Sequence, residues 1–141
     1  MEGVEKMITI LTSSLGGSYK IDGKRVPIYL LNENSLTDKI KSFWKEESKV
    51  LIICASPEEF ELNDSILYCQ KEAFEMSGLI ASSFEICDYR NEQIIEKINA
   101  YDVILLAGGH VPTQNRFFKK IDLKRNYRIL MVSLLHGVLV L

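Results

Sequence analysis

The sequence predicts an α/β fold of three layers, α/β/α, with a mainly parallel sheet between helices. Two observations predict it: short apolar runs typical of buried strands, and amphipathic stretches of helical spacing between those runs. The connections are short, and the chain holds no internal repeat, linker or low-complexity segment. Alternating strands and helices with short connections favour a parallel sheet covered by helices on both faces.

The composition is that of one globular domain of 141 residues, with 47% apolar and 26% charged residues. A net charge of -2 and the lack of a basic stripe argue against a nucleic-acid partner. The acidic N-terminus and the short apolar runs predict neither a signal peptide nor a membrane partner, so we expect a cytoplasmic protein. Cys54, Cys69 and Cys87 form no C-x-x-C pair, which predicts reduced, mostly buried thiols. We expect no metal and no cofactor.

The first half of the chain predicts two strands and one helix. The strands cover residues 6–12 and 49–55, and the helix covers residues 34–44, with Phe43 and Trp44 expected in the core. The polar loop 13–18 lacks both glycine-rich nucleotide fingerprints, so we expect it to border a substrate cleft. Residues 19–31, which contain Asp22-Gly23, predict either a small hairpin or an irregular excursion.

The second half continues the alternation. A helix is expected from Asn63 to about Ser77, with Met76 among its apolar positions and Gly78 as its C-terminal stop. Asn91 is expected to cap a further helix. The remaining expected elements are strands at 82–88, 103–107 and 127–135 and a helix at 111–121.

The stretch 102–115 has the features of a ligand-binding turn. Its apolar run predicts a strand buried on both faces, and Gly108-Gly109 then allow a sharp turn and a close backbone approach. Pro112 suits the first turn of a helix, where its missing N–H is not needed. Strand, glycine turn and helix together place free N–H groups at the carboxyl edge of the sheet, where open α/β folds bind ligands.

Several segments resemble the peptidase S51 family, the peptidase E or aspartyl dipeptidase type, within the class I glutamine amidotransferase-like (flavodoxin-like) fold. The resemblance covers about residues 7 to 125. The segments are Leu-Thr-Ser-Ser-Leu-Gly-Gly, Cys-Ala-Ser-Pro-Glu-Glu-Phe-Glu-Leu-Asn-Asp, Phe-Glu-Met-Ser-Gly and, most specifically, Ala-Gly-Gly-His-Val-Pro-Thr-Gln-Asn.

The resemblance implies a serine-type peptidase that hydrolyses peptide or amide bonds of small peptides. In such enzymes a serine on a tight elbow attacks, a histidine takes its proton, and backbone N–H groups hold the oxyanion. It further implies that Gly108, Gly109 and His110 form the oxyanion or substrate loop. The residues expected to border the cleft are Ser13, Ser14, Ser56 and Asn115.

The tail 127–141 departs from the family pattern, because no Gly-x-Ser-x-Gly motif follows its apolar start. Ser133 has no neighbouring glycine to form an elbow, and His136 would point to the opposite face of a strand. We therefore expect no catalytic residue and no activity in this chain, and we expect it to be a truncated or frameshifted, incomplete single domain. Uncovered sheet elements would then favour self-association.

Two alternatives remain open. One is a non-catalytic α/β domain that binds a small anionic ligand or a partner chain at the glycine turn. The other is a glutaminase-like enzyme with Cys54 as nucleophile, although an apolar strand is the setting of an inert thiol. Acidic residues follow the second strand and either border the cleft or are simply solvated, namely Glu58, Glu59, Glu61 and Asp64.

Overall fold

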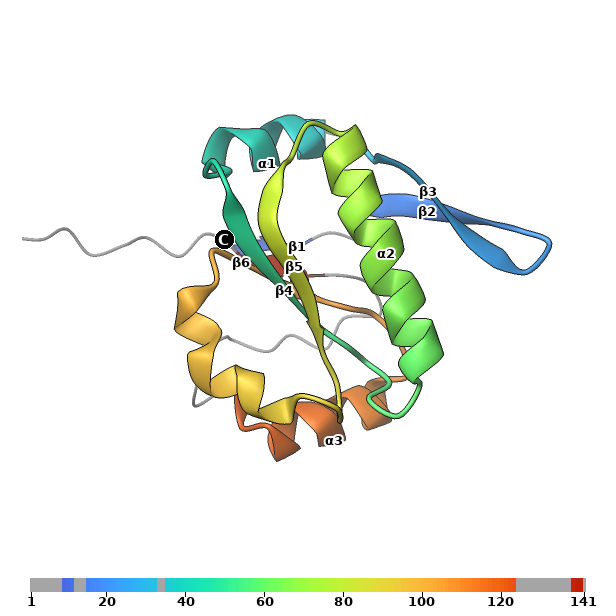
Figure 1. Cartoon of the computed structure of the whole chain (residues 1–141), viewed down its shortest axis with the longest axis vertical. Coiled ribbons are helices and arrows are strands. Elements are labelled where there is room, and N and C mark those ends of the chain that lie inside the picture. The colour runs from blue at the N-terminus through green and yellow to red at the C-terminus, as the bar shows by residue number, and fades with distance from the viewer. Residues whose placement is uncertain (1–8, 12–14, 33–34, 124–137, 141) are drawn as a thin grey trace, which may run out of the picture.

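A computed structural model describes residues 9–11, 15–32, 35–123 and 138–140, and it has the predicted α/β class. A three-stranded parallel sheet forms its centre, and helices flank that sheet (Figure 1).

The three parallel strands carry the core of the molecule. They are β4 (Ser48–Ile53), β5 (Ala81–Cys87) and β6 (Val103–Leu106), with β4 in the middle. Val50 lies opposite Val103 on one side and opposite Phe84 on the other. All four residues of β6 are buried, which confirms the prediction of a strand covered on both faces.

Two short strands extend the sheet beyond β6 and make it mixed. They are β1 (Thr9–Leu11) and β7 (Val138–Val140), and the strand order is β1-β7-β6-β4-β5. β7 runs antiparallel to both of its neighbours. The strand expected at residues 127–135 lies outside the described residues. Within the described residues, the strand next to β6 is thus formed by residues 138–140 of the apolar tail, and it is antiparallel to β6.

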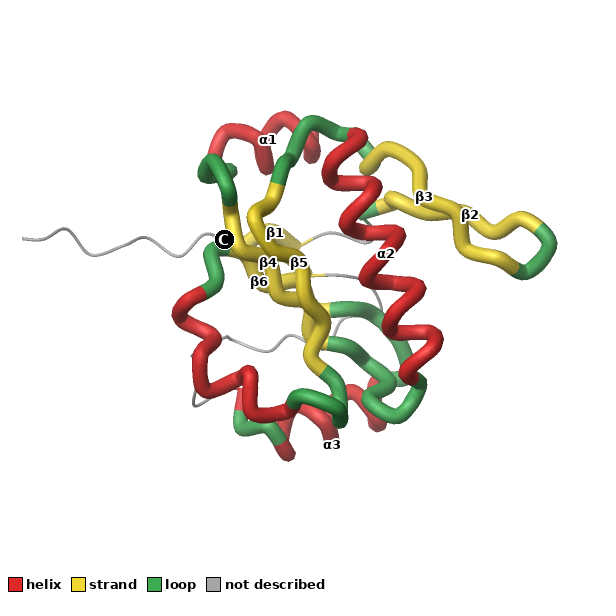
Figure 2. Tube along the Cα trace, in the orientation of Figure 1, coloured by secondary structure: helices red, strands yellow, loops and turns green. Residues whose placement is uncertain are grey.

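A hairpin forms a second sheet apart from the first. Its strands are β2 (Gly16–Ile21) and β3 (Lys24–Leu30), which pair antiparallel around Asp22-Gly23. This decides between the two readings of residues 19–31 in favour of the hairpin. The base of the hairpin is held because the Leu30 N–H donates to Ser77 Oγ at 2.9 Å. The rest of the hairpin extends away from the body (Figure 2).

The helices lie near their predicted positions but differ from the predictions at four residues. They are α1 (Leu36–Phe43), α2 (Phe60–Met76), the 3-10 helix η2 (Glu92–Ala100) and α3 (Val111–Lys120). Asn63 does not begin α2 but lies buried within it, and Met76, expected on its apolar face, is 41% exposed. Phe43, expected in the core, is 47% exposed, and the Asn91 side chain does not cap η2.

The helix ends show why two of these predictions were wrong. Asn91 instead turns its amide to the backbone of the preceding loop, a local alternative that asparagine often takes. Phe43 is the last residue of α1, and the residue that follows it, Trp44, packs against the core instead. The predicted stop at Gly78 is confirmed, because Gly78 has φ +84° just after α2.

Phe74 anchors the packing of α2 on the sheet. It is fully buried, and its ring centroid lies 5.6 Å from that of Trp44 and 5.3 Å from that of Phe84. The indole N–H of Trp44 donates to the Ile80 carbonyl at 2.8 Å, so this half-buried residue packs on the core and also satisfies its polar atom. Within the described parts of the chain, no helix is long and apolar enough to cross a membrane.

Replacing Phe74 by alanine is expected to lower the free energy of unfolding by about 3–5 kcal/mol, because a large cavity opens among three rings. Phe43→Ala is the matched control, since the exposed ring removes little buried area and should cost less than about 1 kcal/mol. Urea unfolding followed by tryptophan fluorescence measures both values. Equal losses in the two variants would contradict this placement of the core.

Candidate functional site

The loops that follow β4, β5 and β6 meet at one edge of the sheet, since carboxyl ends of neighbouring parallel strands lie together. They are residues 54–59, 88–91 and 107–110. The predicted glycine turn is the last of these loops. The site is built by two structures at this edge, the glycine turn itself and a charged cluster around Asp88.

The glycine turn is pressed against the end of β4. A Cβ added to Gly109 would lie only 2.7 Å from the Ala55 Cβ, so glycine is required here by close approach. The Ala107 N–H donates to the Ile53 carbonyl at 3.0 Å, which continues the ladder one residue beyond β6. The buried Gln114 side chain donates to the Ala107 carbonyl and thereby ties α3 back to the turn.

His110 occupies the N-cap position of α3 with an extended backbone, φ -68° and ψ 111°. Its Nδ1 lies 2.8 Å from Thr113 Oγ1, and the residue as a whole is exposed. No described side chain caps this end of α3. The helix therefore begins with backbone N–H groups directed at the solvent-exposed turn, where the positive end of the helix dipole favours an anion.

Asp88 forms the second structure at the edge. Its carboxylate is 1% exposed and lies directly after β5. Arg90 Nη2 lies 2.7 Å from Asp88 Oδ2, and the same atom lies 2.7 Å from the Oδ1 of Asp64 on α2. The Arg90 guanidinium also lies 4.7 Å from the ring centre of Phe60. One half-exposed arginine thus joins the β5 loop to the first turns of α2.

Asparagine side chains complete the cluster. Asn63 Nδ2 donates to the Ser56 carbonyl at 3.0 Å and to Asp88 Oδ2 at 3.2 Å. The Asp88 N–H donates to Asn91 Oδ1, and Asn91 Nδ2 donates to the Ile86 carbonyl, both at 2.9 Å. The loops after β4 and β5 are therefore held to each other by buried polar groups whose partners are present.

The cluster holds its carboxylates ionised. Burial alone would raise the pKa of Asp88, but hydrogen bonds from the Arg90 side chain, the Arg90 backbone and Asn63 outweigh it and lower the pKa. The pKa of Asp64 is also lowered, chiefly by its hydrogen bonds to Arg90. A carboxylate fixed in this way at neutral pH is suited to hold a structure together and is poorly suited to donate a proton.

The three cysteines, of which Cys54 and Cys87 lie at the same edge, have the character of inert thiols. Cys54, Cys69 and Cys87 are all buried, as predicted. Burial, with a smaller contribution from Asp88, raises the pKa of Cys54 to about 12, and the same causes raise the pKa of Cys87 to about 12. These surroundings oppose a thiolate nucleophile at Cys54. Among the described residues, no group of three or more His, Cys, Asp or Glu could hold a metal ion.

The other predicted site residues are placed as follows. Ser56 lies half-buried at the edge, and its carbonyl accepts from Asn63. Asn115 is exposed on α3. Ser13, Ser14, Ser133 and His136 lie outside the described residues. Asp88 and Arg90 were not predicted as site residues, although Asp-Tyr-Arg directly after an apolar strand is a usable signal. Asn63 was predicted only as the start of a helix, and no local pattern links it to Asp88.

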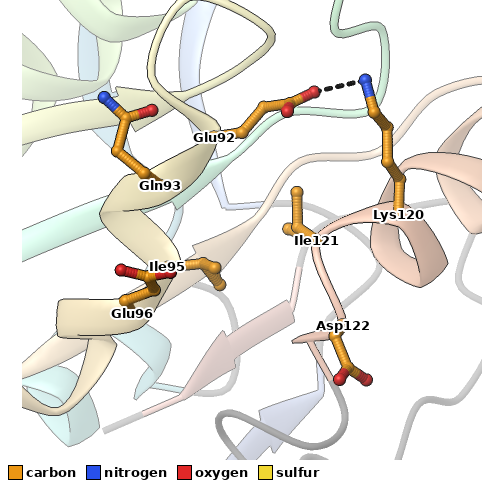
Figure 3. A pocket seen from close by; sticks show the side chains of 7 residues that line it. All are labelled: Glu92, Gln93, Ile95, Glu96, Lys120, Ile121 and Asp122. Carbon is orange, nitrogen blue, oxygen red and sulfur yellow. Dashed lines mark ion pairs between the residues drawn. The ribbon is translucent and has the colours of Figure 1, made fainter.

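A pocket of about 530 Å³ lies at the other end of α3 from the glycine turn (Figure 3). Two of its lining residues, Lys120 and Glu92, form an ion pair with 2.6 Å between Nζ and Oε1, and Lys120 Nζ also lies 4.1 Å from the ring centre of Tyr89. Its lining comes from η2 and the end of α3: Glu92, Gln93, Ile95, Glu96, Lys120, Ile121 and Asp122. None of the predicted site residues lines this pocket.

Comparisons of the chain with protein-family models, with curated proteins and with solved structures found no match.

Replacing Gly109 by alanine is expected to lower the free energy of unfolding by about 1–3 kcal/mol, because the new methyl group overlaps Ala55. Combining it with Ala55→Gly removes the overlap, so the double variant should recover most of that loss. Urea unfolding of the wild type, both single variants and the double variant measures the coupling. Additive effects of the two substitutions would show that the turn does not lie against β4.

Asp88→Asn is expected to destabilise the protein by about 2 kcal/mol at neutral pH, because a charged hydrogen-bond network is broken. The folded pKa of Asp88 lies below its ordinary value of 3.8, so its contribution is present above that pH and is lost as the pH falls below it. The variant should therefore lose less stability than the wild type on acidification.

Urea midpoints from about pH 6 to about pH 2 test this slope. Asp22→Asn, in the exposed hairpin turn, is the control for removing one carboxylate without disturbing a network. Parallel curves for the wild type and Asp88→Asn would contradict the proposed contribution of Asp88.

Proposed function

We propose that this chain is a peptidase-E-like α/β domain of the class I glutamine amidotransferase-like (flavodoxin-like) fold, with three layers. Its glycine turn, residues 108–110, is proposed to bind the carbonyl or carboxylate oxygen of a small peptide. The chain itself would not hydrolyse the peptide, because no Gly-x-Ser-x-Gly motif occurs anywhere in its sequence.

The observation that carries the proposal is the packing of Gly109 on Ala55. This contact places the turn at the carboxyl edge of the sheet and leaves room for no side chain. A turn built in this way can bring its backbone N–H groups close to a ligand oxygen, as an oxyanion site requires. The uncapped start of α3 adds further donors and a favourable dipole at the same place.

Two further features support a rigid site. The Gln114 side chain donates a hydrogen bond to the Ala107 carbonyl. The backbone N–H groups of the turn that follows Ala107 therefore keep one orientation without a ligand. On the adjacent loop, Asn63 holds the Ser56 carbonyl and the Asp88 carboxylate. Donors that need no reorganisation when charge arrives are the kind that stabilise oxyanions most effectively.

The non-catalytic alternative is favoured by a specific observation within the described residues. Cys54, which precedes the Ala55 that contacts the turn, is buried, and burial raises its pKa to about 12. The Nδ1 atom of His110 is hydrogen-bonded to Thr113 Oγ1. A domain that binds a small anionic ligand without catalysing a reaction would need only the backbone N–H groups of the turn.

A titration with a dipeptide that has an N-terminal aspartate tests binding. In ¹⁵N-labelled protein, saturable shifts of the Gly108, Gly109 and His110 amide signals are expected at millimolar concentrations. His110→Pro removes one backbone donor of the turn at a φ of -68°, which proline can adopt, and it should bind about tenfold more weakly. His110→Ala, which keeps the backbone N–H, is the matched control and should bind as the wild type does.

Hydrolysis is followed in the same samples by the appearance of free aspartate, together with labelling by a fluorophosphonate probe. We expect neither product nor label. Shifts spread over other surfaces, with none at the turn, would refute the binding proposal. Hydrolysis with a labelled serine would refute the inactive state while supporting the family proposal.

A further inference from the structure

The hairpin of β2 and β3 protrudes from the body of the described chain (Figure 2). It reaches beyond the body next to α2, and a Cβ added at its tip residue Gly23 would have no atom within 4 Å (Figures 1 and 2). Three of its large apolar side chains are exposed, Tyr19 by 44%, Ile21 by 47% and Tyr29 by 64%. A protruding arm with exposed aromatic residues is typical of a contact surface.

The arm also carries a net positive charge, because Lys20, Lys24 and Arg25 outnumber the one carboxylate of its turn, Asp22. Lys20 lies directly opposite Arg25 in the hairpin register, an arrangement in which like charges destabilise a pair of strands. Arg25 has an uncharged partner, Ser18 Oγ at 3.0 Å. None of the ion pairs among the described residues involves Lys20, Lys24 or Arg25. The arm is therefore suited to meet an anionic surface.

The chain itself carries a surface of net negative charge on α2, where three glutamates outnumber the one cation beside them, Lys71. Glu61, Tyr68, Glu72 and Glu75 are spaced by seven, four and three residues, so they lie on one face of the helix. Tyr68 is 57% exposed, and none of the described ion pairs uses the three glutamates. We refer to these four residues as the acidic stripe.

We propose that two copies of this chain form a symmetric dimer in which the hairpin arm of each copy lies on the acidic stripe of the other. The cations of the arm then face the glutamates, and the exposed tyrosines of both elements are covered. A two-fold axis makes both contacts at once, because each copy offers the same arm and the same stripe. This proposal is independent of the glycine turn.

The decisive experiment uses two variants of opposite charge change. The arm variant is Lys20→Glu/Lys24→Glu, and the stripe variant is Glu72→Lys/Glu75→Lys. Sedimentation equilibrium at about 50 mM salt, where surface charges are weakly screened, is expected to show a dimer for the wild type. Each variant alone should associate at least about tenfold more weakly, because both contacts of its dimer now bring like charges together.

An equimolar mixture of the two variants should restore the dimer. In the mixed dimer one contact has the charges exchanged and the other is the wild-type contact, so both are attractive. Raising the salt to about 500 mM should weaken the wild-type dimer as well. Circular dichroism melts of each variant show whether it is folded. Tyr29→Ala leaves the charges unchanged and tests the apolar contact of the arm separately, so it should also weaken the dimer.

Three results would overturn the proposal. The first is a wild type that stays monomeric at low salt and millimolar concentration. The second is a dimer that both variants form as strongly as the wild type. The third is a monomer whose arm binds a single-stranded oligonucleotide or vesicles of anionic lipid through Lys20 and Lys24, which would assign the cations to another partner.

Discussion

The edge of the sheet depends on one buried charge. Asp88 lies where β5 ends, and its carboxylate is stabilised by Arg90 and by the amide of Asn63. Arg90 then reaches Asp64 on α2, while Asn63 reaches the Ser56 carbonyl on the loop after β4. Removing this carboxylate would leave buried donors without an acceptor, which is more costly than the net contribution of the bonds themselves. The loops that surround the candidate site are thereby held in one arrangement.

The glycine turn uses a different physical device, a steric contact in place of a charge. Gly109 can lie against Ala55 only because neither residue has a larger side chain. Gln114 then closes the turn from the other side by its bond to the Ala107 carbonyl. Together these contacts present backbone donors at the start of α3 without any charged side chain, an environment that suits a weakly bound oxygen ligand.

Charge is distributed unevenly outside this edge. The described ion pairs gather where the helices meet the loops, as with Arg90, Lys120 and Lys45. None of these described ion pairs involves a residue of the hairpin arm or of the acidic stripe of α2. An exposed arm of net positive charge beside a helix face of net negative charge is consistent with contacts made between molecules, for which complementary charge supplies orientation and specificity.

The sequence alone determined the α/β class, the three central strands and the position of the glycine turn. These follow from local patterns: apolar runs such as 103–107 need burial on two faces, and Gly108-Gly109 can end a strand sharply. Tertiary structure decided the rest. The partner of Gly109 is Ala55, some fifty positions earlier, and Arg90 joins Asp88 to Asp64 across two elements. The direction of β7 depended likewise on pairing with β1 and β6. Each of these is a contact between segments that are distant in the sequence. The local pattern of one segment does not determine which distant segment will pack beside that segment.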